Sequence, residues 1–274
     1  MTLTQLVRHY REQLVGEHVY RRYGYLFPLL IKFIDARRDL SIQVHPDEKM
    51  ARQRHGSIGK NEMWYILQAD EHALIRSGFN RSLTVEQFNQ CLADGSILDV
   101  INATYSKPGD VFYIPAGQIH TIGEGNMLVE IQQSSDITYR VWDFNRYDKD
   151  GKLRPLHVQE AREALDFNAR NGQVMDKPNL GNGLTQLVSS EHFEVHHLDV
   201  TDHYTMLMTP PHSFVALVCI QGELTLQVEG MPLATLRQGE TALVPACVDR
   251  VEMDGNARLL LATVPVDHQN MKSI

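Results

Sequence analysis

Apolar and polar residues alternate over short segments along most of the chain after residue 24. Gly, Pro, Asn and Asp separate these segments, as they separate strands that bury one face of a sheet. The segments are LFPLLIKFI, LSIQVH, EMWYILQ, HALIRSGF, DVFYIP, MLVEIQQ, TYRVWDF, FEVHHLDV, SFVALVCIQG, ELTLQVEG, ETALVP, RVEM and ARLLLATV. Because many short strands joined by turn residues are typical of sandwiches and barrels, we expect a mainly β fold.

Three regions interrupt this pattern with helical spacing or polar sequence. Residues 1–24 form a leader whose apolar residues recur as along one face of an amphipathic helix: Leu3, Leu6, Val7, Tyr10 and Leu14. An insertion at about 82–102 has the same periodicity, with Thr84 as the candidate N-cap. Residues 148–172 are polar at first and then helix-like, which is typical of a linker that contains a helix.

Two segments share one pattern of turn residues. GDVFYIPAGQIH begins at Gly109 and GETALVPACVDR begins at Gly239, and in both a Pro-Ala pair follows after five residues. Each is preceded by a strand that ends in Gln. From that Gln to the proline there are 47 residues in the first copy and 24 in the second, and the difference of 23 is about the length of the helical insertion. The pattern predicts two copies of one β-fold.

The repeat and the interruptions divide the chain into four parts. We expect a helical leader at 1–24, a first β-domain at 25–147 that carries the insertion, a linker with a helix at 148–172, and a second β-domain at 173–274.

Composition narrows the class of protein and of partner. The chain has 274 residues, 43% of them apolar and 22% charged, so it can bury a sizeable core. A net charge of −8 argues against a general affinity for nucleic acid or anionic lipid. No apolar run is long enough to span a membrane, and the leader lacks the apolar core of a signal peptide. The three cysteines form no CxxC pattern, which favours a reducing compartment and the cytoplasm by default.

The first repeat copy ends on a histidine that can bind a metal. Its pattern G-x5-P-x-G-x2-H, with His120 last, resembles the second conserved motif of the cupin superfamily, whose small barrels often hold one metal ion. Gln43 and His45 are two residues apart on an expected strand, so their side chains share a face. Lys60 and Glu62 stand in the same relation. Two His, one Glu and an amide oxygen form a mixed ligand set that suits a catalytic zinc.

The second repeat copy lacks this histidine. Where the first copy has Gly117 and His120, the second has Cys247 and Arg250, and a guanidinium does not bind a cation. We therefore expect one zinc ion per chain and a metal-free second domain that covers or braces the first.

Four segments carry a more specific resemblance. FPLLIKFIDARRDLSIQVHPDE, GKNEMWYIL, PGDVFYIPAGQIHTIGEG and LVEIQQSSDITYRVWDFNR resemble class I mannose-6-phosphate isomerases of the short bacterial type. The resemblance implies two cupin-type domains, each a β-barrel or jelly roll, and a zinc-dependent aldose-ketose isomerase that interconverts mannose 6-phosphate and fructose 6-phosphate through an enediol. It further implies zinc ligands at Gln43, His45, Glu62 and His120, an active-site arginine at Arg140, and a family SD pair at Ser135 and Asp136.

The implied reaction assigns roles to the polar residues. Moving a proton between two sugar carbons needs an acid/base group, for which Lys60 and Asp136 are the candidates. Arg140 stays charged, so we expect it either to stabilise the enediolate or to bind the phosphate. Lys60, Arg140 and Ser135 are the expected substrate contacts. Lys60 paired with Glu48 or Asp47 on the surface is the alternative for that lysine.

Other uses of such a fold stay open at this point. Two His and one carboxylate also describe Fe(II) dioxygenases, and a non-catalytic sugar-phosphate-binding cupin would share the site. Family members open with several strands before residue 26, where this chain has its leader, so we expect an unpaired sheet edge beside the site. The expected partner is a small sugar phosphate, and the sequence gives no indication of oligomeric state.

Overall fold

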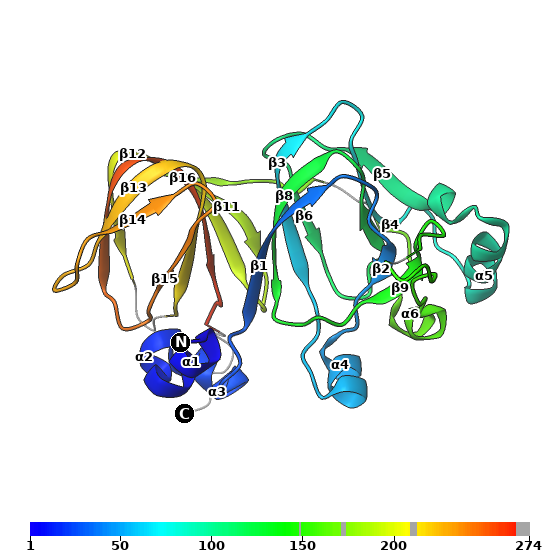
Figure 1. Ribbon diagram of the computed structural model, residues 1–274, viewed down its shortest axis with the longest axis horizontal. Helices are drawn as coiled ribbons and strands as arrows, with labels where there is room; N and C mark the ends of the chain where they lie inside the picture. The colour runs from blue at the N-terminus through cyan, green and yellow to red at the C-terminus, as the bar shows by residue number, and fades with distance from the viewer. Residues whose placement is uncertain (148, 171–173, 209–212, 267–274) are drawn as a thin grey trace. The chain divides into compact units, whose positions relative to one another are not determined.

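The computed structural model describes residues 1–147, 149–170, 174–208 and 213–266, which form two compact units (Figure 1). One unit combines Met1–Leu29 with Asp176–Ile274, and the other is Leu30–Met175. The expected linker at 148–172 falls partly outside the described residues, at 148, 171 and 172; its described part contains helix α6 (Val158–Ala164). The mainly β fold is confirmed, and within the described residues no helix is long and apolar enough to cross a membrane.

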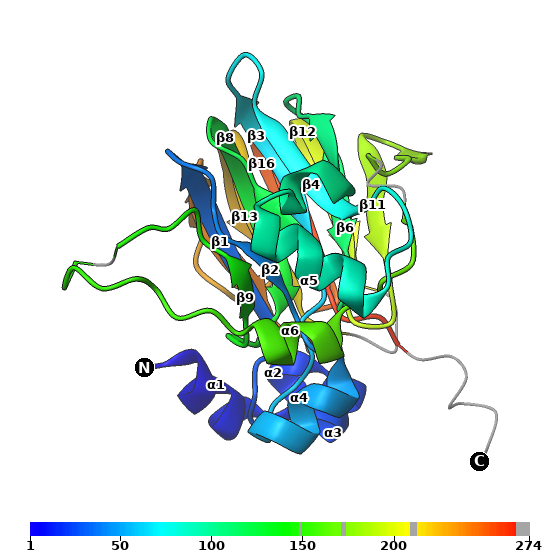
Figure 2. The same cartoon turned by 90° about the vertical axis from the view of Figure 1, so that its right-hand side faces the viewer.

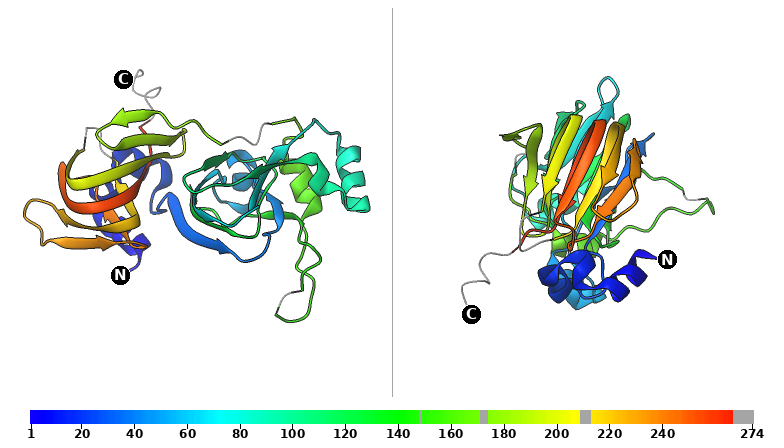
Figure 3. Two further views of the ribbon diagram at one scale, coloured as in Figure 1. Left: turned by 90° about the horizontal axis from the view of Figure 1, so that it is seen from above. Right: turned by 90° about the vertical axis from the view of Figure 1, so that its left-hand side faces the viewer.

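The unit Leu30–Met175 contains two antiparallel sheets that lie opposite each other (Figure 3). The first has the order β1 (Leu29–Ala36), β8 (Asn126–Gln133), β3 (Glu62–Ala69) and β6 (Val111–Ile114). The second has the order β5 (Ile101–Tyr105), β4 (Leu74–Phe79), β7 (His120–Ile122), β2 (Ile42–Val44) and β9 (Tyr139–Trp142). Among the described strands β1 pairs only with β8, so the expected free sheet edge is present.

The described part of this unit has four helical segments. They are α4 (Glu48–His55), α5 (Val85–Asp94), the 3₁₀ turn η1 (Ile97–Val100) and α6. Thr84 caps α5, because its side chain accepts a hydrogen bond from the Gln87 N–H in a capping box. The predicted insertion at 82–102 is thus α5 followed by η1, and Phe88 and Cys91 pack its buried face onto the core.

The other unit contains three short helices and one large sheet. The helices are α1 (Leu3–Tyr10), α2 (Glu12–Val15) and α3 (Glu17–Tyr23). The sheet has the order β10 (Asn179–Gly181), β11 (Leu184–Ser189), β12 (Glu194–Leu207), β16 (Arg250–Thr263), β13 (Val215–Gln227) and β14 (Ala234–Arg237), with β15 (Thr241–Val244) also on β13. An apolar cluster that includes Leu198, Leu217 and Leu259 forms its core.

Two details of the predicted elements were wrong in this unit. The leader is not one amphipathic helix: Arg11 has φ 44° and Gly16 has φ 90°, so the chain turns twice. The apolar face therefore does not continue, and Leu3 stays exposed while Val7 and Leu14 are buried.

Strands expected to be separate are continuous. SFVALVCIQG and ELTLQVEG form β13, and RVEM and ARLLLATV form β16. Gly222 lets β13 bend without ending: its φ is 80°, and a Cβ there would lie 2.2 Å from the Asn256 carbonyl oxygen.

The two repeat copies make the same backbone hydrogen bonds. The Gly109 N–H donates to the Ile66 carbonyl over 2.8 Å, and the Gly239 N–H donates to the Cys219 carbonyl over 2.9 Å. The Ile66 and Cys219 amides in turn donate to the residues that follow the two glycines. The predicted repeat is therefore present in the backbone of both units.

Candidate metal centre and substrate cavity

Strand β2 brings three predicted site residues onto one face. Gln43 lies directly opposite His120 on β7 and opposite Arg140 on β9. Directly opposed residues of antiparallel strands project to the same side of the sheet, so the side chains of Gln43, His120 and Arg140 point the same way. His45 follows Gln43 by two residues, just after the end of β2.

Glu62, at the start of β3 in the other sheet, completes a buried cluster with His45 and His120. Their candidate ligand atoms all lie within 4.8 Å of one another, and the three side chains are at most 1% exposed. The Nε2 atom of His45 is 3.3 Å from Oε2 of Glu62, and the Nε2 atom of His120 is 3.2 Å from Oε1. Both imidazoles thus face one carboxylate.

Backbone carbonyls fix the tautomers of the two imidazoles. His45 Nδ1 lies 2.9 Å from the Ile137 oxygen, and His120 Nδ1 lies 2.8 Å from the Gln118 oxygen. A carbonyl oxygen only accepts, so each Nδ1 carries the proton and each Nε2 presents a lone pair to Glu62. Burial favours this neutral form, because it lowers the pKa of His45 to about 4 and lowers the pKa of His120 as well.

This set of donors fits a metal cation. Burial alone would raise the pKa of Glu62, but the charge of Lys60, with smaller contributions from the neighbouring imidazoles, brings it well below its usual range, so Glu62 is a carboxylate. Both of its oxygens are buried, and within the described residues neither accepts a hydrogen bond. Two nitrogen lone pairs facing a carboxylate repel it unless a cation lies beside them. In this structure the Lys60 ammonium lies 3.0 Å from Oε2 of Glu62 and 3.0 Å from Nε2 of His45, and His₂Glu is a known ligand set for a divalent metal.

Gln43 lies next to this cluster with its amide nitrogen toward it. The Nε2 atom is 3.2 Å from Nε2 of His120, while Oε1 accepts from the Ser41 hydroxyl over 3.3 Å. The predicted ligand atom, the amide oxygen, therefore points away; rotating the amide by 180° would turn it toward His120.

Lys60 is buried beside the cluster. Its Nζ lies 3.0 Å from Oε2 of Glu62 and 3.0 Å from Nε2 of His45. The alternative of a surface lysine paired with Glu48 or Asp47 is wrong: Glu48 accepts from the side chain of Gln133, and Asp47 caps α4.

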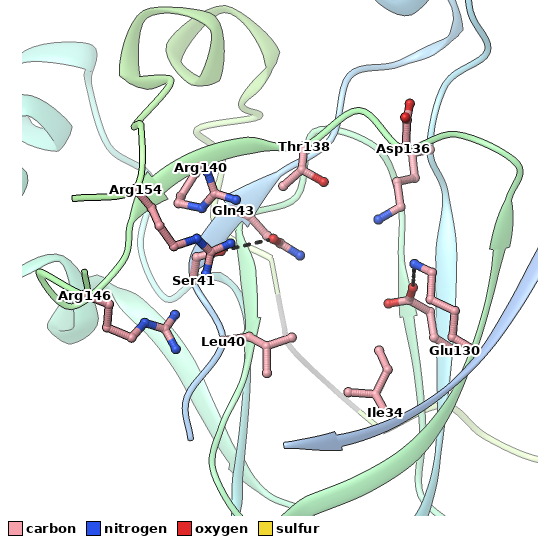
Figure 4. A pocket seen from close by; sticks show the side chains of 12 residues that line it. Ile34, Leu40, Ser41, Gln43, Glu130, Asp136, Thr138, Arg140, Arg146 and Arg154 are labelled. Carbon is pink, nitrogen blue, oxygen red and sulfur yellow. Dashed lines mark hydrogen bonds and ion pairs between the residues drawn. The ribbon is translucent and has the colours of Figure 1, made fainter. Parts of the chain in front are cut away.

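A cavity of about 420 Å³ opens next to the cluster (Figure 4). Four predicted site residues line it: Gln43, Lys60, Asp136 and Arg140. Two of these lining residues contact the three candidate ligands: Gln43 contacts His120, and Lys60 contacts His45 and Glu62. Ser135 is not a lining residue; it is 3% exposed, and its hydroxyl lies 3.5 Å from the Ile137 amide.

Comparison with known proteins places this arrangement in a family. The model of the type I phosphomannose isomerase catalytic domain matches residues 1–72, and that of the mannose-6-phosphate isomerase cupin domain matches 183–264. The mannose-6-phosphate isomerase of Streptococcus mutans is 36% identical over 236 residues, which are 86% of this chain and 73% of that protein. The chain belongs to the mannose-6-phosphate isomerase family.

Other members of the mannose-6-phosphate isomerase family agree. ManA of Bacillus subtilis is 31% identical over 272 residues, covering 95% of this chain and 81% of that protein. The crystal structure of the mannose 6-phosphate isomerase from Bacillus subtilis superposes with a TM-score of 0.83 at 29% identity, covering 94% of this chain and 81% of that one. The resemblance noted in the sequence is confirmed, and with it the cupin-type fold.

The cavity of this mannose-6-phosphate isomerase family member also contains residues that sequence reasoning missed. Lys32 on the edge strand β1 donates to Oε1 of Glu130 over 2.6 Å, and Trp64 donates to Oε2 of Glu130 over 3.1 Å. Lys32 interrupts the apolar run LFPLLIKFI, and Glu130 interrupts the apolar run MLVEIQQ. These interruptions were the signal in the sequence that could have identified both residues. Thr138, Arg146 and Arg154 also line the cavity.

Arg140 is held at the cavity wall by the chain that follows β9. Its Nη1 donates to the Pro155 carbonyl over 2.9 Å, while its buried Nε has no hydrogen-bond partner among the described residues. Burial, followed by the charge of Arg154, lowers the pKa of Arg140. In the described ion pairs Asp143 binds Arg146 and Arg154, so Arg140 keeps its charge for the cavity.

Proposed function

We propose that the protein interconverts mannose 6-phosphate and fructose 6-phosphate in the cavity beside Lys60, Asp136 and Arg140. The observation that carries this proposal is the buried cluster of His45, Glu62 and His120 next to a cavity lined by charged groups. The relatives from Streptococcus mutans and Bacillus subtilis are mannose-6-phosphate isomerases.

We propose zinc as the metal, one per chain, with His45, Glu62 and His120 as ligands and Gln43 as a weaker fourth. Two imidazoles and one carboxylate leave positions open for substrate, as in catalytic zinc sites. When bound, zinc acts as a Lewis acid toward the sugar oxygens. The first β-domain, 25–147, then contains the metal site, and the second, 173–274, contains none.

The residues of the chain divide the remaining work. The isomerisation removes a proton from C2 of the aldose and returns one to C1, or the reverse. Lys60, buried against Glu62, and Asp136, exposed at the cavity wall, are the groups that can hold this proton. Arg140 cannot give up its own proton and instead stabilises the negative charge that develops on the sugar oxygens. Ser135 supports the chain beside Asp136.

We propose that the protein works in the cytoplasm on a small sugar phosphate, without nucleic acid or membrane partners. The three cysteines are free: Cys91 and Cys219 are buried and Cys247 is exposed. Free thiols persist in a reducing compartment, and the net charge of −8 does not favour polyanionic partners.

A coupled assay of fructose 6-phosphate formation from mannose 6-phosphate tests the activity directly. Zinc-loaded protein should turn over at a rate proportional to its metal content. Iron found in place of zinc, together with consumption of oxygen, would favour a dioxygenase. Substrate binding without any turnover would show a sugar-phosphate-binding cupin and refute the proposed isomerase.

A further inference from the structure

Asp143 joins two arginines at the cavity wall. Its carboxylate is 4% exposed; Oδ1 accepts from Arg146, and Oδ2 lies 3.3 Å from Nη1 of Arg154. Residues 143–147 and 149–157 leave the body of the unit as an arm between β9 and α6, visible in Figure 2, with a β-bridge between Tyr147 and Leu153. The carboxylate thus fixes the base of this arm and orients both guanidinium groups.

These arginines line the side of the cavity on which Gln43 also lies (Figure 4). Arg146 donates through Nη1 to the Asp39 carbonyl over 2.6 Å. Asp39 precedes Gln43 by four residues, and it is Gln43 that contacts His120. Figure 4 shows the three arginine side chains together on one side of the cavity and Asp136 and Glu130 across from them. The arginines therefore form one wall of the cavity, and Asp136 and Glu130 form the opposite wall.

The net charge of the arginines and Asp143 on this wall of the cavity suits a phosphate dianion. Arg140, Arg146 and Arg154 contribute three positive charges and Asp143 one negative charge, so two positive charges are uncompensated. Arg154 has no described side-chain interaction besides its ion pair with Asp143, so its other N–H groups are available. Guanidinium groups bind phosphate oxygens in pairs, with charge and geometry matched. An anion here would also relieve the repulsion between Arg140 and Arg154, which contributes to the lowered pKa of Arg140.

We propose that Arg146 and Arg154, oriented by Asp143, bind the phosphate group of the substrate and select phosphorylated over free sugars. This inference rests on the proposed function for the identity of the substrate. It assigns Arg140, which is opposite Gln43 on β9, to the reacting end of the sugar. The arginines of the arm thus bind the phosphate, and the proton transfer takes place beside the metal cluster.

The test measures phosphate binding separately from catalysis. Full-length, metal-loaded protein is titrated with inorganic phosphate by calorimetry, for wild type, Arg154→Gln and Arg146→Gln. Arg37→Gln is the matched control, because Arg37 is an exposed arginine of the same unit that pairs with Asp35 and does not line the cavity. Arg154 is 39% exposed, so its replacement leaves the fold intact, which melting temperatures check.

Each arginine variant should weaken phosphate binding about 10- to 100-fold and raise KM for mannose 6-phosphate by a similar factor, with a much smaller change in kcat. Arg37→Gln should match wild type. Unchanged phosphate affinity in both arginine variants, or no phosphate binding by wild type, would overturn the inference. If wild type binds phosphate and the variants do not, but no protein isomerises the sugar, the inference stands and the proposed reaction fails.

Discussion

Glu62 and Val215 occupy equivalent positions in the two units. Glu62 is opposite Ile114 on β6, and Val215 is opposite Val244 on β15. Two residues further along, Trp64 is opposite Glu130 and Leu217 is opposite Leu261. The register irregularity after Ile66 recurs after Cys219. One backbone frame therefore accepts buried carboxylates in one unit and aliphatic side chains in the other.

The two units differ in how much these interior side chains contribute to the free energy of unfolding. Burying a Val or Leu side chain contributes about 1.5–3 kcal/mol to stability, and the unit with Val215 gains this at its interior positions. Buried charges give no such gain, because desolvation offsets their attraction. His120 is buried whereas its counterpart Arg250 is exposed, and the group of candidate metal ligands found among the described residues is that of His45, Glu62 and His120.

The largest effect is expected when Glu62 is replaced by valine, the residue type found at the equivalent position Val215. Glu62→Val, like His120→Ala, should abolish stoichiometric zinc and lower kcat/KM by about 10³-fold or more, because several kcal/mol of charge stabilisation are lost. Glu62→Val should also lower the free energy of unfolding by about 3–5 kcal/mol, since Lys60 stays buried without its carboxylate. Elemental analysis, kinetics and urea unfolding measure the three quantities.

Arg250→Ala is the control for this pair. Its zinc content and activity should equal those of wild type, because Arg250 is exposed and lies outside the candidate metal site. One zinc per chain surviving in His120→Ala, or a second zinc lost in Arg250→Ala, would contradict the asymmetry between the units.

Lys60→Ala should have the next largest effect. If Lys60 takes part in the proton transfer, kcat should fall about 10²–10⁴-fold with little change in KM and with zinc still bound. Steady-state kinetics on protein of known zinc content provide the measurement. A variant with wild-type kcat would leave Asp136 as the group that moves the proton.

Arg140→Ala should cost somewhat less. Loss of one charged donor to the developing oxyanion lowers kcat by about 10²–10³-fold. Because Arg146 and Arg154 hold the phosphate, KM should change little. A rise in KM with normal kcat would instead assign the phosphate to Arg140.

The smallest effect concerns acid stability of the metal-free unit. Burial lowers the pKa of His196 and His197 on β12. An unfolded histidine takes up a proton below about pH 6.5 while the folded one stays neutral, so the stabilisation is complete above that pH and is lost as the pH falls. The variant His196→Gln/His197→Gln should therefore lose less stability than wild type between about pH 7.5 and pH 5.5, in urea unfolding of zinc-loaded protein. Equal losses would show that these histidines do not contribute.

Local signals in the sequence predicted part of this molecule well. Period-two alternation indicated the strands, and Thr84 with Gln87 marked the start of α5 because capping depends on neighbouring residues only. The two-residue spacing of Gln43 and His45, and of Lys60 and Glu62, indicated a shared face within each pair for the same reason. The turn at Arg11 could not be predicted from the sequence, because it depends on how the leader packs and not on the spacing of its apolar residues.

Contacts between residues that are distant in the sequence could not be predicted from such local signals. Arg146 lies 107 residues from Asp39, to which it bonds, and Arg154 lies in a polar stretch without periodicity. The orientation of the Gln43 amide depends on Ser41 and on the opposite strand. Only the three-dimensional arrangement brings the arm and its arginines to the cavity beside Arg140.

The carbonyl contacts of His45 and His120 have a kinetic consequence. Because Ile137 and Gln118 already hold each Nδ1 proton, neither ring needs to rotate or change tautomer when an ion arrives. Binding of the ion then requires the Lys60 ammonium to move away from Glu62 and the Gln43 amide to rotate, while the two imidazoles stay in place. Newly folded chains can therefore load metal as a fast, single-phase reaction.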